Sequence, residues 1–293
     1  MKPSRSQFLS LRGRRQHLRC WGPQEAPLVV FLHGWGDVSS SWQFVVDALH
    51  REWRVAALDW RGFGLSQGNG DAYWFPDYIA DLDALLQHLS PGAPVDLVAH
   101  SMGGNIATLY AGIRPERVRR LVNLEGTGLP RHDAAEAPGR YAKWLDQLRD
   151  AAPAFRTYPD HATFARRLQK ENPRLTDERA DFLSRHLGEE CRDADGNPGV
   201  RLAADPAHRW VNPILYRIEE AMACWRRVTA PVLWVTGRES FLFREFFAAT
   251  SDDYRSRIAC FADVREVMIE AAGHNLHHDC PEDVARLAEE FLA

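Results

Sequence analysis

Residues 95–105 read VDLVAHSMGGN, and this stretch places a serine between an apolar run and a helix-like segment. VDLVA predicts a buried strand, whereas NIATLYAGI, residues 105–113, predicts a helix. Ser101 stands at the junction, with Ala99 two residues before it and Gly103 two residues after it. A sharp strand-to-helix turn needs small flanking residues, so the pattern is G-x-S-x-G with alanine at the first position. A serine that merely caps the helix is the alternative interpretation.

Short apolar runs and longer helical patterns alternate on both sides of this stretch. The alternation predicts an α/β fold with a mostly parallel sheet covered by helices on both faces. Segments 7–13 and 16–22 alternate weakly and predict an antiparallel hairpin at the sheet edge. The alternation of strand and helix patterns stops within residues 129–228, where helical patterns carry many arginines and aromatic residues. We therefore expect an α/β core of residues 1–128 and 229–293, interrupted by a helical cap of residues 129–228.

Composition narrows the class of protein. The 293 residues include 36 Lys and Arg against 40 Asp and Glu, so the net charge of -4 gives no general attraction to nucleic acid or anionic lipid. No apolar run approaches the ~18 residues of a membrane span. The five cysteines form no CxxC pair, which favours reduced thiols. We expect a cytoplasmic protein without a nucleic-acid or membrane partner, and the sequence leaves its oligomeric state open.

Three further segments complete an ordered set with the serine turn: LHGWGD at residues 32–37, LDWRGFGLS at 58–66 and AAGHNLHHDCPE at 271–282. Together they resemble the α/β-hydrolase family over nearly the whole chain, with the insertion in the position of the family's cap domain. The resemblance implies that Ser101 is the nucleophile and His274 the general base. It also implies an oxyanion hole made by the N–H groups of Trp35 and Met102, and a substrate pocket that His33, Gly34 and His100 adjoin.

The acid of the triad departs from the family pattern. Most relatives carry an aspartate where this sequence has Ser240, and a serine cannot hold the charge that stabilises a histidine cation. Glu239 is adjacent to that place, but a one-residue shift normally turns a side chain elsewhere. Glu125 ends the strand-like run LVNLE, and some haloalkane dehalogenases are similar in placing their acid there. We favour Glu125 and keep Glu239 as the alternative.

Two more histidines follow the predicted base. His277 and His278 lie beyond the loop, at the start of the last helical segment, so we expect structural roles for them. His274, His277, His278 and Asp279 contain metal-ligand residue types, but nothing in the sequence requires an ion, and no metal or other cofactor is expected.

A serine paired with a histidine base suits acyl transfer, whereas haloalkane dehalogenases use an aspartate nucleophile. The sequence therefore predicts hydrolysis of an ester-like bond in a small molecule, and the aromatic residues of the cap favour an apolar or aromatic acyl group. A carbon-carbon bond hydrolase, a lactonase or a perhydrolase would use the same residues. A ligand-binding scaffold with weak catalysis is the alternative from another class, and the serine at position 240 is the feature that favours it.

Overall fold

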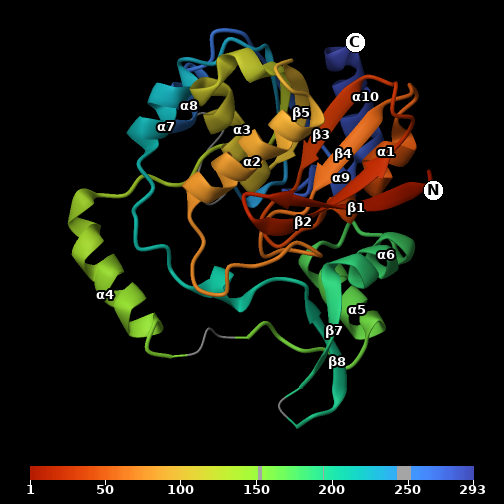
Figure 1. The fold of residues 1–293 in the computed structure, drawn as a ribbon, viewed down its shortest axis with the longest axis vertical. Coiled ribbons are helices and arrows are strands. Elements are labelled where there is room, and N and C mark those ends of the chain that lie inside the picture. The colour runs from red at the N-terminus through yellow and green to blue at the C-terminus, as the bar shows by residue number, and fades with distance from the viewer. Residues whose placement is uncertain (151–153, 194, 243–251) are drawn as a thin grey trace.

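The computed structural model describes residues 1–150, 154–193, 195–242 and 252–293. Its centre is an eight-stranded sheet with the strand order β1-β2-β4-β3-β5-β6-β9-β10 (Figure 1). The strands from β4 to β10 in this order run parallel, while β1 and β2 form an antiparallel hairpin at one edge. The predicted parallel sheet and edge hairpin are therefore confirmed. The strands are β1 (Ser4–Leu11), β2 (Arg14–Trp21), β3 (Leu28–Leu32), β4 (Arg54–Leu58), β5 (Val95–His100), β6 (Val118–Leu124), β9 (Val232–Gly237) and β10 (Val264–Ile269).

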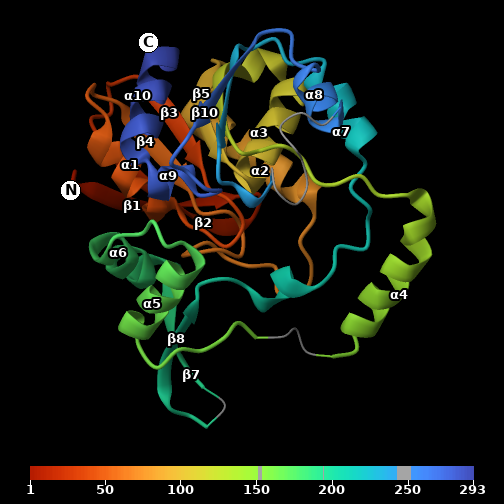
Figure 2. The ribbon, with the colours of Figure 1, turned by 180° about the vertical axis from the view of Figure 1, so that it is seen from behind.

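Helices cover both faces of the sheet because successive strand residues point to opposite sides. On β5, Leu97 and Ala99 face one buried cluster, whereas Val98 faces the other. The first cluster is covered by α2 (Phe75–Leu89), α3 (Met102–Ile113), α7 (Ile218–Trp225) and α8 (Asp252–Ile258). The second is covered by α1 (Gln43–Ala48), α9 (Leu276–Asp279) and α10 (Pro281–Leu292), as Figures 1 and 2 show from opposite sides.

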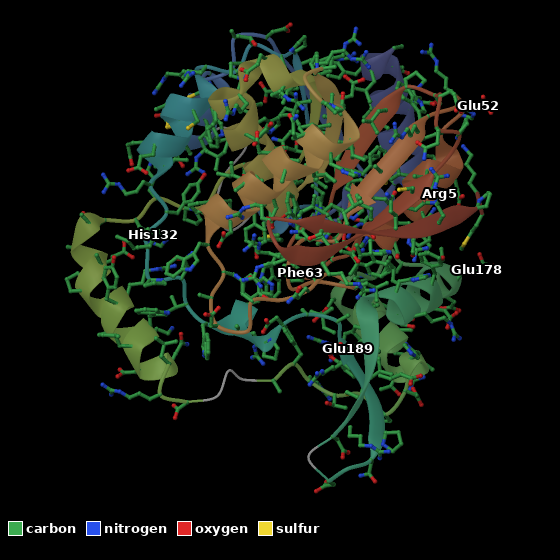
Figure 3. All side chains as sticks on the ribbon, in the orientation of Figure 1. Arg5, Glu52, Phe63, His132, Glu178 and Glu189 are labelled. Atoms are coloured by element: carbon green, nitrogen blue, oxygen red, sulfur yellow. The ribbon has the colours of Figure 1, made fainter. Side chains whose placement is uncertain are left out.

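The insertion projects from one end of this layered core (Figure 1). It contains α4 (Ala137–Gln147), α5 (His161–Glu171) and α6 (Asp177–Leu187), followed by a hairpin of β7 (Gly188–Arg192) and β8 (Pro198–Leu202). Short 3-10 helices η1 to η4 cover Ser39–Trp42, Pro115–Arg117, Ala134–Glu136 and Pro206–Arg209. Figure 3 labels Glu189 on the hairpin, His132 before α4, and Phe63, a core residue that faces the insertion.

Two features of residues 129–228 differ from the expected helical cap. The hairpin β7–β8 is not helical, and α7 packs against core helix α3. The two helices approach so closely that a Cβ at Gly112 would lie 1.9 Å from the carbonyl oxygen of Cys224. Ile218, Ala221 and Trp225 face the core because their spacing puts them on one side of α7.

Among the described residues, no helix combines the length and the apolar composition that crossing a bilayer requires.

Candidate active site

The turn after β5 holds Ser101 in a backbone conformation that few residues adopt. Its φ of 50° and ψ of -114° lie outside the helical and extended regions. The Ser101 N–H donates to the carbonyl of Leu124 at 2.8 Å, which fixes the turn to the end of β6. A Cβ at Gly103 would lie 2.5 Å from the carbonyl oxygen of Leu32, so this position needs glycine for α3 to reach β3. The Ser101 hydroxyl makes no capping hydrogen bond to α3, and it points instead to a histidine.

Three side chains from distant parts of the chain form a hydrogen-bonded series at this turn. The Oγ of Ser101 lies 3.0 Å from Nε2 of His274, and Nδ1 of His274 lies 3.1 Å from Oε2 of Glu125. The carboxylate can only accept, so Nδ1 carries the proton and Nε2 is left to accept from the serine hydroxyl. The Glu125 side chain is fully buried, whereas that of His274 is one-fifth exposed.

Ser240, which stands at the usual acid position, forms a hydrogen bond to Glu125 instead of acting as the acid. The hydroxyl of Ser240 donates to Oε2 of Glu125 at 2.5 Å, and the N–H of Gly237 donates to Oε1 at 2.8 Å. With His274, the buried carboxylate thus has three donors, which offset its desolvation. Sequence reasoning missed this role of Ser240 because it asked only whether serine could carry charge. Glu239, the alternative acid, pairs with Arg174 of the insertion and is more than half exposed.

Removing the hydroxyl of Ser240 tests this arrangement. Ser240→Ala is expected to lower turnover about tenfold and to destabilise the protein, since a hydrogen bond to a charged group contributes about 1.5–3 kcal/mol. Steady-state kinetics and thermal unfolding measure the two effects. Ser184→Ala is the matched control, because this buried hydroxyl donates to a backbone carbonyl within α6. Equal turnover in the two variants would contradict a role for Ser240.

The loop after β3 packs against the serine turn. His33 accepts the N–H of Trp60 on Nε2 at 2.9 Å and donates from Nδ1 to the carbonyl of Gly34 at 2.7 Å. Burial lowers the pKa of His33, which keeps this neutral tautomer. A Cβ at Gly34 would lie 3.2 Å from Cβ of Ser101, so the loop runs directly against the nucleophile. The next residue, Trp35, lines a cavity together with Met102, the first residue of α3.

His33, Gly34 and His100, expected to adjoin the substrate pocket, are all buried next to the serine turn. They are not among the described residues that line the cavity, and neither are Ser101 and His274, so their place beside a substrate pocket stays a prediction. Nε2 of His100 lies 2.8 Å from the carbonyl oxygen of His274, so His100 holds the backbone of the predicted base from behind. His33 bonds to neighbouring backbone groups through both ring nitrogens and His100 through Nε2, so both histidines support the site from behind.

His277 and His278 have buried positions behind the site. Nε2 of His277 bonds to Oδ2 of Asp37 at 2.9 Å. Burial would raise the pKa of Asp37, but this bond and the nearby imidazoles hold that pKa far below its ordinary value. Burial lowers the pKa of His100 well below its usual range and that of His278 to about 3, so both rings are neutral at neutral pH.

The insertion forms hydrogen bonds to the segment that carries His274. The carboxylate of Asp279 accepts the N–H of Gly273 at 2.8 Å and the side-chain amide of Asn172 at 2.6 Å. Arg174 donates from Nε to the carbonyl of Ala271 at 3.0 Å. Sequence reasoning missed the contacts of Asn172 and Arg174 because they join residues about a hundred positions apart.

Asn172→Ala is expected to lower kcat several-fold with little change in KM, because His274 loses part of its support while the cavity keeps its lining. Gln169→Ala is the matched control, since its amide bonds to Asp177 within the insertion. Initial rates over a range of ester concentrations separate the two parameters. An unchanged kcat in Asn172→Ala would show that the contact between insertion and loop does not position the base.

The cavity lined by Trp35 and Met102 has a volume of about 160 Å³, and Ser101 and His274 are not among its described lining residues. In other proteins, an apolar cavity of about this size accommodates benzene. Burial lowers the pKa of His208 to about 4, so this lining residue is neutral at pH 7. No lysine or arginine is found among the described lining residues. The wall is mainly aromatic, with Trp35, Tyr73, Trp74, Phe75, Tyr78, Trp144 and Trp210.

The fold and the serine turn define an α/β hydrolase, and comparison with known proteins agrees. The model of the family described as "alpha/beta hydrolase fold" matches residues 27–281, so the chain belongs to this family. A serine hydrolase-like protein of Danio rerio is 30% identical over 280 residues, covering 93% of this chain and 83% of that protein.

Solved structures share the same architecture. A thioesterase domain from the curacin biosynthetic pathway has a TM-score of 0.85 and 27% identity, covering 98% of this chain and 99% of that domain. An esterase of Mycobacterium tuberculosis has a TM-score of 0.73 at 22% identity, covering 99% of this chain and 92% of that chain, and so shares the fold. The predicted fold class is confirmed.

Proposed function

We propose that this protein is a serine hydrolase that cleaves carboxylic esters or thioesters of small molecules through a Ser101–His274–Glu125 triad. The observation that carries the proposal is the continuous series from the Ser101 hydroxyl through both ring nitrogens of His274 to the buried carboxylate of Glu125. Each member supplies what acyl transfer requires: a nucleophile, a proton acceptor and an ionised group that orients the acceptor.

The reaction has two acyl-transfer steps. Ser101 Oγ attacks the carbonyl carbon while its proton passes to Nε2 of His274, and the N–H groups of Trp35 and Met102 stabilise the oxyanion. The leaving alcohol or thiol departs with that proton, which leaves an acyl-serine. Water then attacks the acyl carbon with His274 again as the base, and the acid product leaves as Ser101 regains its proton.

The cavity supports an apolar or aromatic acyl group of modest size. Its aromatic wall offers area for apolar contact, and no described lining residue supplies a cation for a substrate carboxylate. The likeness to a thioesterase domain supports including thioesters among the candidate substrates. Alternatives that use the same triad, including carbon-carbon bond hydrolysis, lactone hydrolysis and perhydrolysis, differ in substrate rather than in the residues that act.

Labelling with a fluorophosphonate followed by intact-mass analysis is the direct test. We expect one adduct on the native protein and none on Ser101→Ala. A panel of aryl and alkyl esters and thioesters should then favour short apolar acyl groups. Folded protein that takes up no adduct would contradict an activated serine and favour the ligand-binding scaffold.

A further inference from the structure

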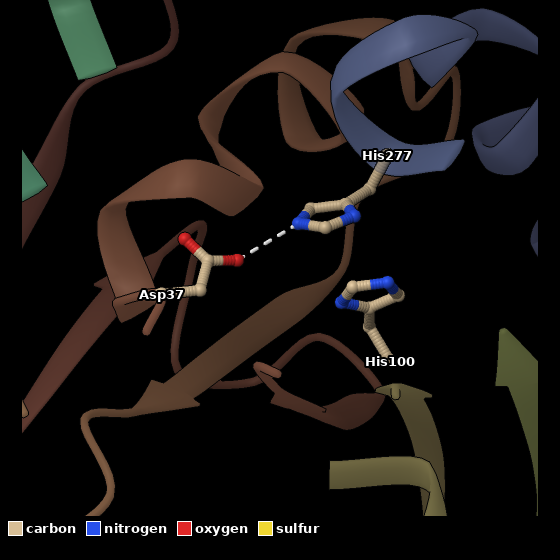
Figure 4. A group of neighbouring side chains, drawn as sticks. All are labelled: Asp37, His100 and His277. Carbon is tan, nitrogen blue, oxygen red and sulfur yellow. Dashed lines mark hydrogen bonds and ion pairs between the residues drawn. The ribbon is translucent and has the colours of Figure 1, made fainter. Parts of the chain in front are cut away.

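Behind the predicted base lies a buried group of one carboxylate and three imidazoles. Asp37 follows β3, His100 ends β5, and His277 and His278 lie on α9. Figure 4 shows the rings of His100 and His277 beside the carboxylate of Asp37. All four residues are at most 7% exposed, so polar atoms in this group have little access to water.

Three nitrogens in this group lack partners. Nδ1 of His100, Nδ1 of His277 and Nε2 of His278 are buried and have no hydrogen-bond partner among the described residues. An unpartnered buried polar atom is costly, and a group of them next to a carboxylate calls for a bound species such as water or an ion.

The tautomer of His100 favours an ion. Its Nε2 bonds to the carbonyl of His274, which can only accept, so the proton is on Nε2 and Nδ1 carries a free lone pair. Histidines that bind metals show this arrangement, in which one nitrogen donates to a backbone carbonyl and the other is the ligand. The second candidate ligand atom, Nε2 of His277, already lies 2.9 Å from Oδ2 of Asp37.

We propose that Asp37, His100 and His277 bind a divalent transition-metal ion such as Zn²⁺. One ligand atom from each residue lies within 4.8 Å of the others. Zn–N bonds of about 2.0–2.1 Å place neighbouring ligand atoms roughly 3.4 Å apart, so on binding the widest pair closes by at most about 1.4 Å and the His277–Asp37 pair, at 2.9 Å, opens by about 0.5 Å. To bind the ion through Nε2, a neutral His277 must give up the proton that this atom donates to Asp37. The proton can pass to Nδ1, which has no hydrogen-bond partner among the described residues before binding, so no net proton is released.

A second cavity, of about 170 Å³, lies between the core and helices α5 and α6 and adjoins this group. Asp37 and His278 line it, and their side chains are 9% and 7% exposed. His100 and His277 are not among its described lining residues, so the insertion covers the Asp37 and His278 side of the group.

Titration of the metal-free full-length protein with Zn²⁺, in competition with a chromogenic chelator, tests binding. We expect one equivalent to bind with a micromolar or lower Kd and His277→Gln to weaken it at least 100-fold, because glutamine keeps a donor toward Asp37 but removes the ligand. His132→Gln is the matched control, since His132 pairs with Glu136 on the surface at 3.0 Å. Equal affinity in native protein and His277→Gln, or no binding in the native protein, would overturn the site and leave water as the bound species.

Two measurements on the native protein do not depend on the folding of a variant. Co²⁺ should give visible absorption without a thiolate charge-transfer band, which excludes binding by the free cysteines. Zn²⁺ should also shift the ¹⁵N resonances of His100 Nδ1 and His277 Nε2. Unchanged resonances, or a thiolate band, would contradict the ligand set.

Discussion

Ser101→Ala is expected to lower ester turnover by about 10⁴- to 10⁶-fold, because no other group at the turn can form the acyl intermediate. The fold should persist, since alanine leaves the N–H of position 101 bonded to Leu124 and adds no atom to the crowded contact at Gly103. Turnover of the best ester from the panel and the thermal unfolding midpoint measure the two effects.

Ser184→Ala controls for the loss of a buried hydroxyl and should keep turnover within twofold of the native protein. Retention of more than about 1% activity by Ser101→Ala, after mass analysis shows no native contaminant, would mean that another group attacks the carbonyl. The same preparation should bind substrate with little change in affinity, because the cavity wall is intact.

Glu125→Gln is expected to lower kcat by about 10³- to 10⁴-fold with a small change in KM. Glutamine is nearly the same size, and its amide oxygen can still accept from the N–H of Gly237, with the amide NH2 turned toward the Ser240 oxygen, but it lacks the charge that stabilises the histidine cation. Kinetics on the best ester measure this loss, and circular dichroism checks the fold.

Glu239→Gln is the matched control for the acid. Its carboxylate is largely exposed and pairs with Arg174, so we expect turnover within about threefold of the native protein. A large loss in Glu239→Gln with a small loss in Glu125→Gln would reverse the assignment. Small losses in both variants would leave the base without a carboxylate partner and would contradict the triad.

Local pattern predicted the sheet, the edge hairpin and the turn at Ser101. Strand and helix periodicities are properties of a few successive residues, and the small residues Ala99 and Gly103 mark a turn that larger ones would block. The same kind of pattern predicted a helical insertion but missed the hairpin β7–β8. It also missed the packing of α7 on α3, because the apolar face of a helix does not identify the surface that it contacts.

What the sequence by itself determined is the α/β core and the order in which its loops present Ser101, Glu125 and His274. The tertiary structure alone decided how these loops meet: that Glu125 reaches His274 across 149 positions of chain, that Ser240 donates to Glu125, and that His33 and His100 support the site from behind. The physical reason is that hydrogen bonds and burial depend on distances in space. Sequence periodicity reports only which way each side chain points from its own strand or helix.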